Sequence, residues 1–274
     1  MTMKSEIILK HLINNISNIE EIQSIGISGI IEPIPKAGEG DIDIFIYCDE
    51  IPKLDVRKTI VNQMGDLLQE VRINVFEGGH WGSGDFALIN GVETWLMYFT
   101  VGGTLNDIQS ILNGNCPDRL DNYYYPVGRC AMLKDINVLY DKNDFLCSLK
   151  KRLADYPDEL SNQLAKHHLA ELEDIEDLER AVARKDVLFY HFALDLAMDH
   201  YFQALFAINK RYFPSRKRTL QFIGSFHTKP RDCEEHLLEV IRLGASSESI
   251  NASYELWSKL ITELRYLYQR KIDI

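Results

Sequence analysis

The stretch from residue 38 to 48, Gly-Glu-Gly-Asp-Ile-Asp-Ile-Phe-Ile-Tyr-Cys, constrains the fold of this chain more than any other. It has the alternation of a β-strand that follows a glycine-rich turn. Side chains alternate between the two faces of a strand, so Ile42 and Ile44 share one face. Asp41 and Asp43 therefore lie side by side on the opposite face.

Two carboxylates held close together need an explanation. At about 5 Å and an effective dielectric constant of about 20, they repel each other by roughly 3 kcal/mol. A divalent cation bound to both removes that cost, and Asp-x-Asp on a strand is typical of Mg²⁺ sites for phosphoryl or nucleotidyl transfer. The alternative is a half-exposed edge strand on which Asp41 and Asp43 simply face water.

Length and charge restrict the class of protein. A chain of 274 residues forms one large domain or two of ordinary size. The sequence is 46% hydrophobic and 26% charged, which is ordinary for a globular protein with a real core. A net charge of −11 argues against binding of long nucleic acid, which needs a basic surface. It leaves room for a nucleotide-sized ligand.

Several features predict a cytoplasmic protein with no membrane partner. The five cysteines form no CxxC pair, which favours free thiols in a reducing compartment. Residues 1–10 lack the apolar core of a signal peptide. Charged or polar side chains, including Asp195 and Asp199, interrupt the most apolar long stretch, residues 187–208, so we expect no membrane span there.

The pattern along the chain changes near residue 150 and predicts an α+β protein. We expect a mixed-sheet α/β domain over residues 1–152 and an all-α helical bundle over residues 153–274. Besides the aspartate strand, the expected strands are 22–31, 72–77, 86–90, 92–101 and 136–140. The expected helices are 5–15, 55–70, 146–153, 187–212, 233–243 and 253–269.

A cage for a metal ion needs a third carboxylate on a strand next to the aspartate strand, because adjacent strands lie only about 4.8 Å apart. Glu93 is the first candidate, since it is an acidic residue among strand-forming residues. Asp85 is the second, although it is expected in a loop. An outward-facing strand position is the alternative interpretation of Glu93.

The first strand is expected to end at Ser28-Gly29, close to the aspartate strand. A glycine there lets the backbone approach a phosphate group, and the serine hydroxyl and free N–H groups can bind it. Any strand-to-loop turn can contain Ser-Gly. The pair gains meaning because Asp41-x-Asp43 follows after a short loop.

Together these residues resemble nucleotidyltransferases of the DNA polymerase beta superfamily, in particular the small antibiotic-type enzymes. The resemblance rests on a Gly/Ser turn, a glycine-containing loop, Asp-x-Asp on a strand and a later acidic residue. It implies a nucleotidyltransferase domain in the N-terminal half. Asp41, Asp43 and Glu93 would be its catalytic and metal-binding residues, and Ser28 and Gly29 would bind the nucleotide.

The helical half also carries the resemblance, through an Asn–Tyr-Phe-Pro–Lys pattern that begins at Asn209. Lys217 closes this pattern and belongs to a basic cluster that could contact a triphosphate. The alternative for the cluster is a helix C-terminus balanced by cations. His167-His168 lacks the spacing of a zinc-protease helix and is expected on the surface.

His191, Asp195 and Asp199 recur every four residues on an otherwise apolar helix. Such a polar stripe either faces water or lines a cleft that binds the acceptor of the transferred group. The acidic balance favours a small, cationic acceptor with a hydroxyl group over DNA or RNA.

The sequence therefore predicts an Mg²⁺-dependent nucleotidyltransferase that moves a nucleoside monophosphate from an NTP, most simply ATP, to a hydroxyl of a small molecule. The alternative is a nucleotide-binding regulatory or antitoxin-like protein that has the same fold and no turnover. The Ser-Gly order at residues 28–29 and the glutamate at the third acidic position favour that alternative. A purely structural helical adaptor would require Asp41 and Asp43 to be incidental.

Overall fold

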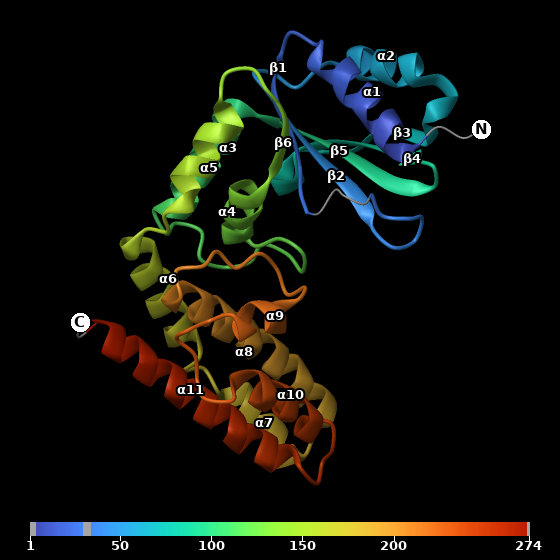
Figure 1. Ribbon diagram of the computed structural model, residues 1–274. Coiled ribbons are helices and arrows are strands. Elements are labelled where there is room, and N and C mark those ends of the chain that lie inside the picture. Colours follow the sequence, from blue (N-terminus) through green and yellow to red (C-terminus); the bar gives the residue numbers. More distant parts are fainter. Residues whose placement is uncertain (1–3, 30–33, 273–274) are drawn as a thin grey trace. The chain divides into compact units, whose positions relative to one another are not determined.

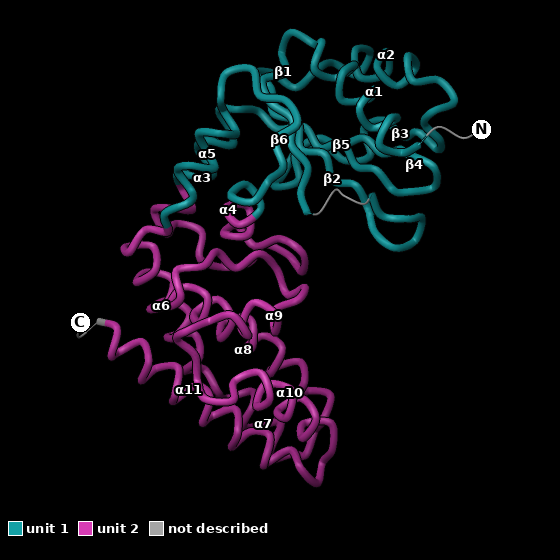
Figure 2. The backbone as a smooth tube through the Cα atoms, in the orientation of Figure 1, with its two compact units in different colours: residues 1–109, 132–155 teal, residues 110–131, 156–274 magenta. Residues whose placement is uncertain are grey.

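The computed structural model describes residues 4–29 and 34–272 (Figure 1). Two compact units make up the chain (Figure 2). The sheet unit consists of residues 1–109 and 132–155, and the helical unit of residues 110–131 and 156–274. The predicted α+β class, a mixed sheet followed by helices, is confirmed. The division into domains after residue 152 stays a prediction.

The sheet unit contains six strands in the order β3-β4-β5-β2-β1-β6. Neighbouring strands are antiparallel except β2 and β5, which run parallel. The strands are β1 (Ile22–Ile27), β2 (Asp41–Cys48), β3 (Gln69–Glu77), β4 (Ser83–Ile89), β5 (Val92–Thr100) and β6 (Asn137–Asp141).

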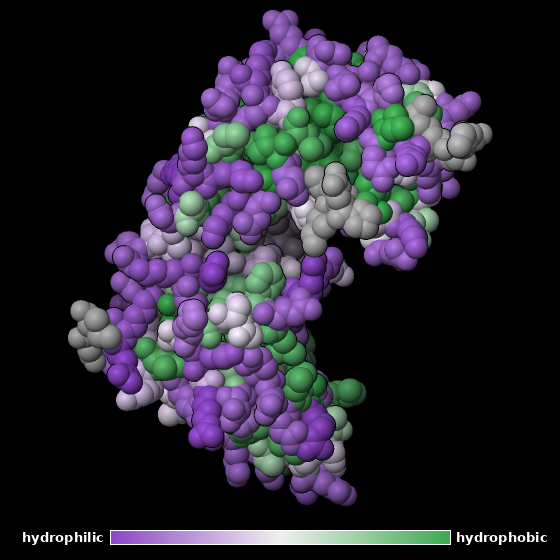
Figure 3. All heavy atoms as spheres, in the orientation of Figure 1, coloured by the Kyte–Doolittle hydropathy of each residue, from purple (hydrophilic) through white to green (hydrophobic). Residues whose placement is uncertain are grey.

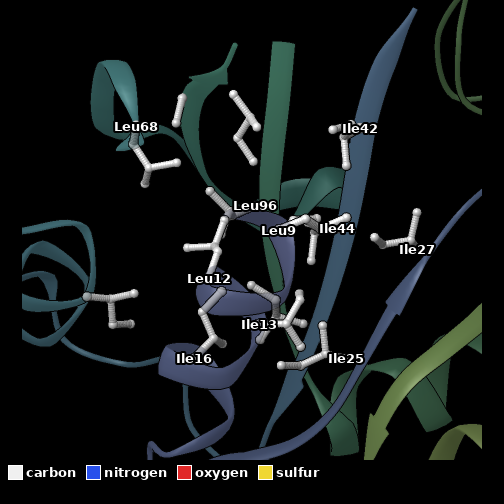
Figure 4. Close-up of a cluster of buried hydrophobic side chains, with 14 of the residues drawn as sticks. Leu9, Leu12, Ile13, Ile16, Ile25, Ile27, Ile42, Ile44, Leu68 and Leu96 are labelled. Carbon is white, nitrogen blue, oxygen red and sulfur yellow. The ribbon is translucent and has the colours of Figure 1, made fainter. Parts of the chain in front are cut away.

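One face of the sheet packs against helix α1 (Ser5–Ser17) and helix α2 (Leu54–Met64) (Figure 1). In α1, Leu12 is fully buried and belongs to the same cluster as Ile44 of β2 and Leu96 of β5 (Figure 4). Burial of each such side chain stabilises the fold by about 1.5–3 kcal/mol. This core fixes which face of β2 points inward.

The opposite face of the sheet also packs closely at its β1 side. A Cβ atom on Gly26 would lie 2.5 Å from the side chain of Ile136 and 3.2 Å from that of Leu146. Leu146 belongs to helix α5 (Phe145–Ala154), whose Phe145 ring lies 5.4 Å from the ring of Tyr47. Gly26 therefore allows α5 and its neighbours to approach β1.

Turn residues decide where several elements end. The predicted helix over 55–70 is too long, because α2 ends at Met64 and Gly65 has a φ of 52°. A positive φ is the conformation in which glycine has no steric cost. Asn90 and Gly91 both have positive φ, as the tight hairpin turn between the antiparallel strands β4 and β5 requires.

Two helices follow β5 where the sequence predicts none: α3 (Val101–Leu112) and α4 (Pro126–Asp135). The hydroxyl of Thr100 accepts a hydrogen bond of 3.1 Å from the backbone N–H of Gly103, which caps the start of α3. Gly102 and Gly103 lower the helix propensity of this turn and so hide the helix from a sequence pattern.

Among its described residues, the helical unit contains six further helices. They are α6 (Asp158–Glu171), α7 (Glu176–Arg184), α8 (Val187–Ile208), α9 (Thr219–Gly224), α10 (Cys233–Gly244) and α11 (Ile250–Ile272). Trp257 of α11 is fully buried with its ring 5.2 Å from that of Tyr201 of α8. Within the described part of the chain, no helix has both the length and the apolar character needed to cross a membrane. Hydrophilic side chains cover much of the face in Figure 3.

Candidate functional site at the edge of the sheet

Three carboxylates meet where the parallel strands β2 and β5 begin. Asp41 is in register with Glu93, and Asp43 with Trp95. Paired residues on adjacent strands point to the same face, so all three acidic side chains lie on the face opposite the α1 and α2 core. Ile42, between the aspartates, is only 3% exposed on that core side. The predicted shared face of Asp41 and Asp43 is confirmed, and Glu93 lies on it.

The end of the sheet at which β2 and β5 begin is exposed to solvent. Aromatic side chains lie further along the same face. Asp41 and Glu93 are exposed, and Asp43 is half-buried. Trp95, next to Asp43 in the register, lies 4.9 Å ring to ring from Phe86 and 6.1 Å from Phe76. The carboxylates thus border a cluster of aromatic side chains, which is a suitable neighbour for a nucleobase.

The turn after β1 lies beside the aspartate strand. The backbone N–H of Ser28 donates to the backbone carbonyl of Asp43 at 3.3 Å. Gly29 has a φ of 79°, and its carbonyl accepts a 2.7 Å hydrogen bond from the Asn137 side chain. The end of the predicted strand, residues 30–31, lies outside the described residues. The hydrogen bond to Asp43 occupies the backbone N–H of Ser28, so phosphate binding would use its hydroxyl; phosphate binding by Ser28 and Gly29 stays a prediction.

Asp85 does not belong to this group. It is in register with Leu96, a core residue, so its side chain lies on the α1 and α2 face. There it accepts a 2.9 Å hydrogen bond from Nε of Arg57 and one of 2.8 Å from the backbone N–H of Asn74. Asp85 is also in strand β4, and the expectation of a loop was wrong. The alternative choice of third carboxylate is therefore excluded by the register.

The residues present at the edge fit a hard divalent cation. Carboxylate oxygens are the ligands that Mg²⁺ prefers, and two aspartates with a third acid across a strand pair supply them. In the described part of the chain, Asp41 and Glu93 form no ion pair with an arginine or lysine. The three acids are not among the groups whose ligand atoms lie within 4.8 Å of one another.

A cavity of about 360 Å³ lies elsewhere in the sheet unit. Its lining comes mostly from α1, including Leu9 and Ile13, with Leu139 of β6. None of the three carboxylates lines it, so this cavity is not part of the candidate site.

The polar stripe of α8 lies in the helical unit and is occupied by a cation from the chain itself. Arg216 forms ion pairs with both Asp195 and Asp199, at 2.9 Å to the latter. The Asp199 side chain is 7% exposed and also accepts a 2.7 Å hydrogen bond from the hydroxyl of Tyr125. Arg119 lies 3.6 Å from its other oxygen. No local sequence pattern indicates that Tyr125 and Arg119 join this cluster, because both come from a segment far from α8 in the chain.

Burial and contact with Asp199 shift the pKa values of Tyr125 and Arg216 in this cluster. Burial and the hydrogen bond to Asp199 raise the pKa of Tyr125 to about 12. For Arg216, burial acts to lower the pKa, but the hydrogen bond and charge of Asp199 outweigh it and raise the pKa. Both groups therefore keep their protons at neutral pH. Through Arg216, Asp199 ties α8 to the segment after it.

The remaining predicted site residues are placed as follows. His191 is half-buried on α8, and Asp195 is 56% exposed at its side chain. Lys217 is exposed, and its backbone N–H donates to the Ser215 hydroxyl at 3.2 Å. Nucleotide binding by Lys217 and acceptor binding by His191, Asp195 and Asp199 stay predictions.

Comparison with known proteins gives limited information. Residues 124–218, about a third of the chain, match a family described as domain of unknown function (DUF4037). That stretch contains Tyr125, Asp199 and Arg216 but none of the three edge carboxylates. No curated protein matches the chain.

The chain is also similar to a crystal structure of a nucleotidyltransferase-like protein from Exiguobacterium sibiricum 255-15. The sequence identity is 12%, the match covers 98% of this chain and 75% of that one, and the TM-score is 0.47. Because this likeness is distant, we base the proposed function on residues of this chain.

Proposed function

We propose that this protein is an Mg²⁺-dependent nucleotidyltransferase that moves a nucleoside monophosphate from ATP to a hydroxyl of a small-molecule acceptor. The observation that supports this proposal most is the register of Asp41 with Glu93 across the parallel strands β2 and β5. Together with Asp43 it gives three acids on one open face. The resemblance of the motifs to the DNA polymerase beta superfamily supports the same reaction.

In this proposal Asp41 and Asp43 hold the cation from one strand and Glu93 completes the set from the next. The bound ion would neutralise the charge of the triphosphate. The acceptor oxygen attacks the α-phosphorus, the bond from that phosphorus to the bridging oxygen breaks, and pyrophosphate leaves. Glu93 accepts the proton of the attacking hydroxyl. The hydroxyl of Ser28, the backbone at Gly29 and the side chain of Lys217 would bind phosphate oxygens.

Two arguments support nucleotidyl transfer at the three carboxylates. In-line transfer to a phosphorus atom needs positioning and charge neutralisation more than a covalent intermediate. Asp41 and Glu93 are exposed and have no ion pair with an arginine or lysine among the described residues, so both carboxylates are accessible to a cation from solution. His191, Asp195 and Asp199 are retained as the proposed acceptor-binding residues.

The test combines nucleotide binding with turnover. Thermal stabilisation by ATP should require Mg²⁺, and Asp41→Asn and Asp43→Asn should each remove it. Asp107→Asn, an exposed acid on α3, is the matched control and should behave as the wild type does. If both edge variants bind MgATP as the wild type does, the proposal is wrong.

Turnover separates the enzyme from the alternative protein. Pyrophosphate release in the presence of a panel of small cationic alcohols identifies a transferase. Mg²⁺-dependent stabilisation by ATP without pyrophosphate release across the panel supports the regulatory protein instead. The absence of any stabilisation by ATP supports a structural role for the fold.

A further inference from the structure

A cluster of one carboxylate and two imidazoles lies within the helical unit. Asp118 precedes α4, and His167 and His168 are adjacent residues of α6. One ligand atom from each of the three lies within 4.8 Å of the others. Nε2 of His167 is 2.8 Å from Oδ1 of Asp118. All three belong to the same compact unit, so their mutual placement is defined.

His168 is the unusual member of the cluster. The sequence suggested a surface position, but its side chain is fully buried. Nδ1 of His168 lies 3.0 Å from Nδ1 of His200 on α8. Its Nε2 is also buried. The backbone of Pro117, the residue before Asp118, interacts with the same ring.

The contacts of His168 suit metal binding, in which one ring nitrogen of a histidine is the ligand. Metal-binding histidines commonly use the other ring nitrogen in a hydrogen bond that fixes the ring. The contact with His200 can supply that bond.

The donor set also indicates the kind of ion. Two imidazoles and one carboxylate are ligands of Zn²⁺ and similar borderline divalent ions, whereas Mg²⁺ prefers oxygen alone. Ligand atoms about 2.0–2.1 Å from a tetrahedral ion lie about 3.3 Å apart. The 2.8 Å separation of Asp118 and His167 is close to this spacing. A small opening of the cluster would admit the ion.

The second compact group of possible ligands in the described chain has another explanation. Asp141, Asp144 and Cys147 lie near the start of α5. Oδ2 of Asp141 accepts the backbone N–H of Cys147 at 2.9 Å, and its Oδ1 accepts the Ser24 hydroxyl. This carboxylate caps a helix, so the group carries no metal site.

We propose that Asp118, His167 and His168 form a binding site for a Zn²⁺-like divalent ion in the helical unit, separate from the acidic edge of the sheet. The ion fixes the segment between α3 and α4, which contains Asp118, to helix α6. Three protein ligands leave a fourth position for water. The site is structural, because it cross-links two segments of one compact unit.

The test uses the full chain, stripped of metal with a chelator, and Zn²⁺ alone as the probe. Calorimetry should show saturable binding of a single ion, and Zn²⁺ should raise the melting temperature. Asp118→Asn and His167→Ala should each weaken binding about tenfold or more. Both positions are at least partly exposed, so these variants should fold. Co²⁺ bound in place of Zn²⁺ should give the intense visible absorption of a tetrahedral site.

Two controls locate the ion. His227→Ala removes an exposed histidine of the same unit and should leave binding unchanged. Asp41→Asn should also bind Zn²⁺ as the wild type does, so failure of the nucleotidyltransferase proposal would not affect this result. Absence of saturable Zn²⁺ binding overturns the proposal. So does binding that survives in both Asp118→Asn and His167→Ala, because the ion is then held elsewhere.

Discussion

Asp85→Asn should destabilise the sheet unit strongly, because Asp85 neutralises a buried arginine. The side chains of Arg57 and Asp85 are each 2% exposed and form an ion pair with two hydrogen bonds. The guanidinium carbon of Arg57 also lies 4.7 Å from the centre of the Tyr98 ring. In the variant, Arg57 keeps its charge in this buried position and loses its partner.

The size of the expected loss in stability follows from the burial of both Arg57 and Asp85. Breaking a fully buried ion pair costs about 3–5 kcal/mol, chiefly because one charge is left uncompensated. Burial acts to lower the pKa of Arg57, but the hydrogen bond and charge of Asp85 outweigh it and raise the pKa. A domain is stable by about 5–15 kcal/mol in total. The loss should lower the melting temperature by roughly 10–20 °C.

The measurement must follow the sheet unit separately from the helical unit. The chain has three tryptophans, and only Trp257 lies in the helical unit. In a Trp257→Phe background, fluorescence of Trp81 and Trp95 therefore reports unfolding of the sheet unit. Arg57→Met should be similarly damaging, and the double variant Arg57→Met/Asp85→Asn should lose less than the sum of the two single variants.

One pattern of results would refute this reasoning. If Asp85→Asn melts as its parent does but abolishes Mg²⁺-dependent turnover, Asp85 is part of the reactive site and not of the core. A double variant whose loss equals the sum of the single losses would show that Arg57 and Asp85 do not stabilise each other.

Three further predictions concern single acids. Glu93→Gln should reduce pyrophosphate release far more than MgATP binding, with unchanged thermal stability, because this side chain is exposed; a silent variant would remove it from the site. Asp195→Asn should raise the KM for the acceptor and leave ATP affinity nearly unchanged, and a fall in kcat alone would contradict this. Burial acts to raise the pKa of Asp141, but hydrogen bonds from Ser24 and Cys147 outweigh it and lower the pKa. Because the pKa of Asp141 is lower in the folded than in the unfolded protein, Asp141 stabilises the fold fully above the unfolded-state pKa of about 4. This contribution is lost as the pH falls below that value. Asp141→Asn should cost about 1–2 kcal/mol at neutral pH, and urea unfolding should show this difference shrinking in acid.

Local sequence signals predicted the elements that are strongly periodic. The alternation in β2 and the Asn90-Gly91 turn each follow from a few neighbouring residues, and both are present. Helix α3 was not predicted, because the glycines at its start lower the helix propensity. Its stability comes from packing and from the Thr100 cap. The overlong prediction for α2 has a similar cause, since Gly65 ends the helix although the apolar pattern continues.

Long-range pairing explains what the sequence could not determine about the site. Asp41 and Glu93 come together because β2 and β5 are parallel neighbours, and no local pattern gives that register. A shift of one residue would send Glu93 to the core face. The same limit applies to Asp85, whose partner Arg57 lies on α2, and to His168, which is buried by packing of α6 against α8.

The carboxylates of this protein differ in where their compensating charge comes from. Asp85 and Asp199 are buried, and each has an arginine within the chain as a partner. Asp41 and Glu93 have no such partner among the described residues, although they face each other across adjacent strands. Internal pairs hold the fold together with or without a ligand. Acids without an internal cation can instead bind one from solution, and for this reason the edge of β2 and β5 is the place in the sheet unit where binding of a cation and a triphosphate is expected.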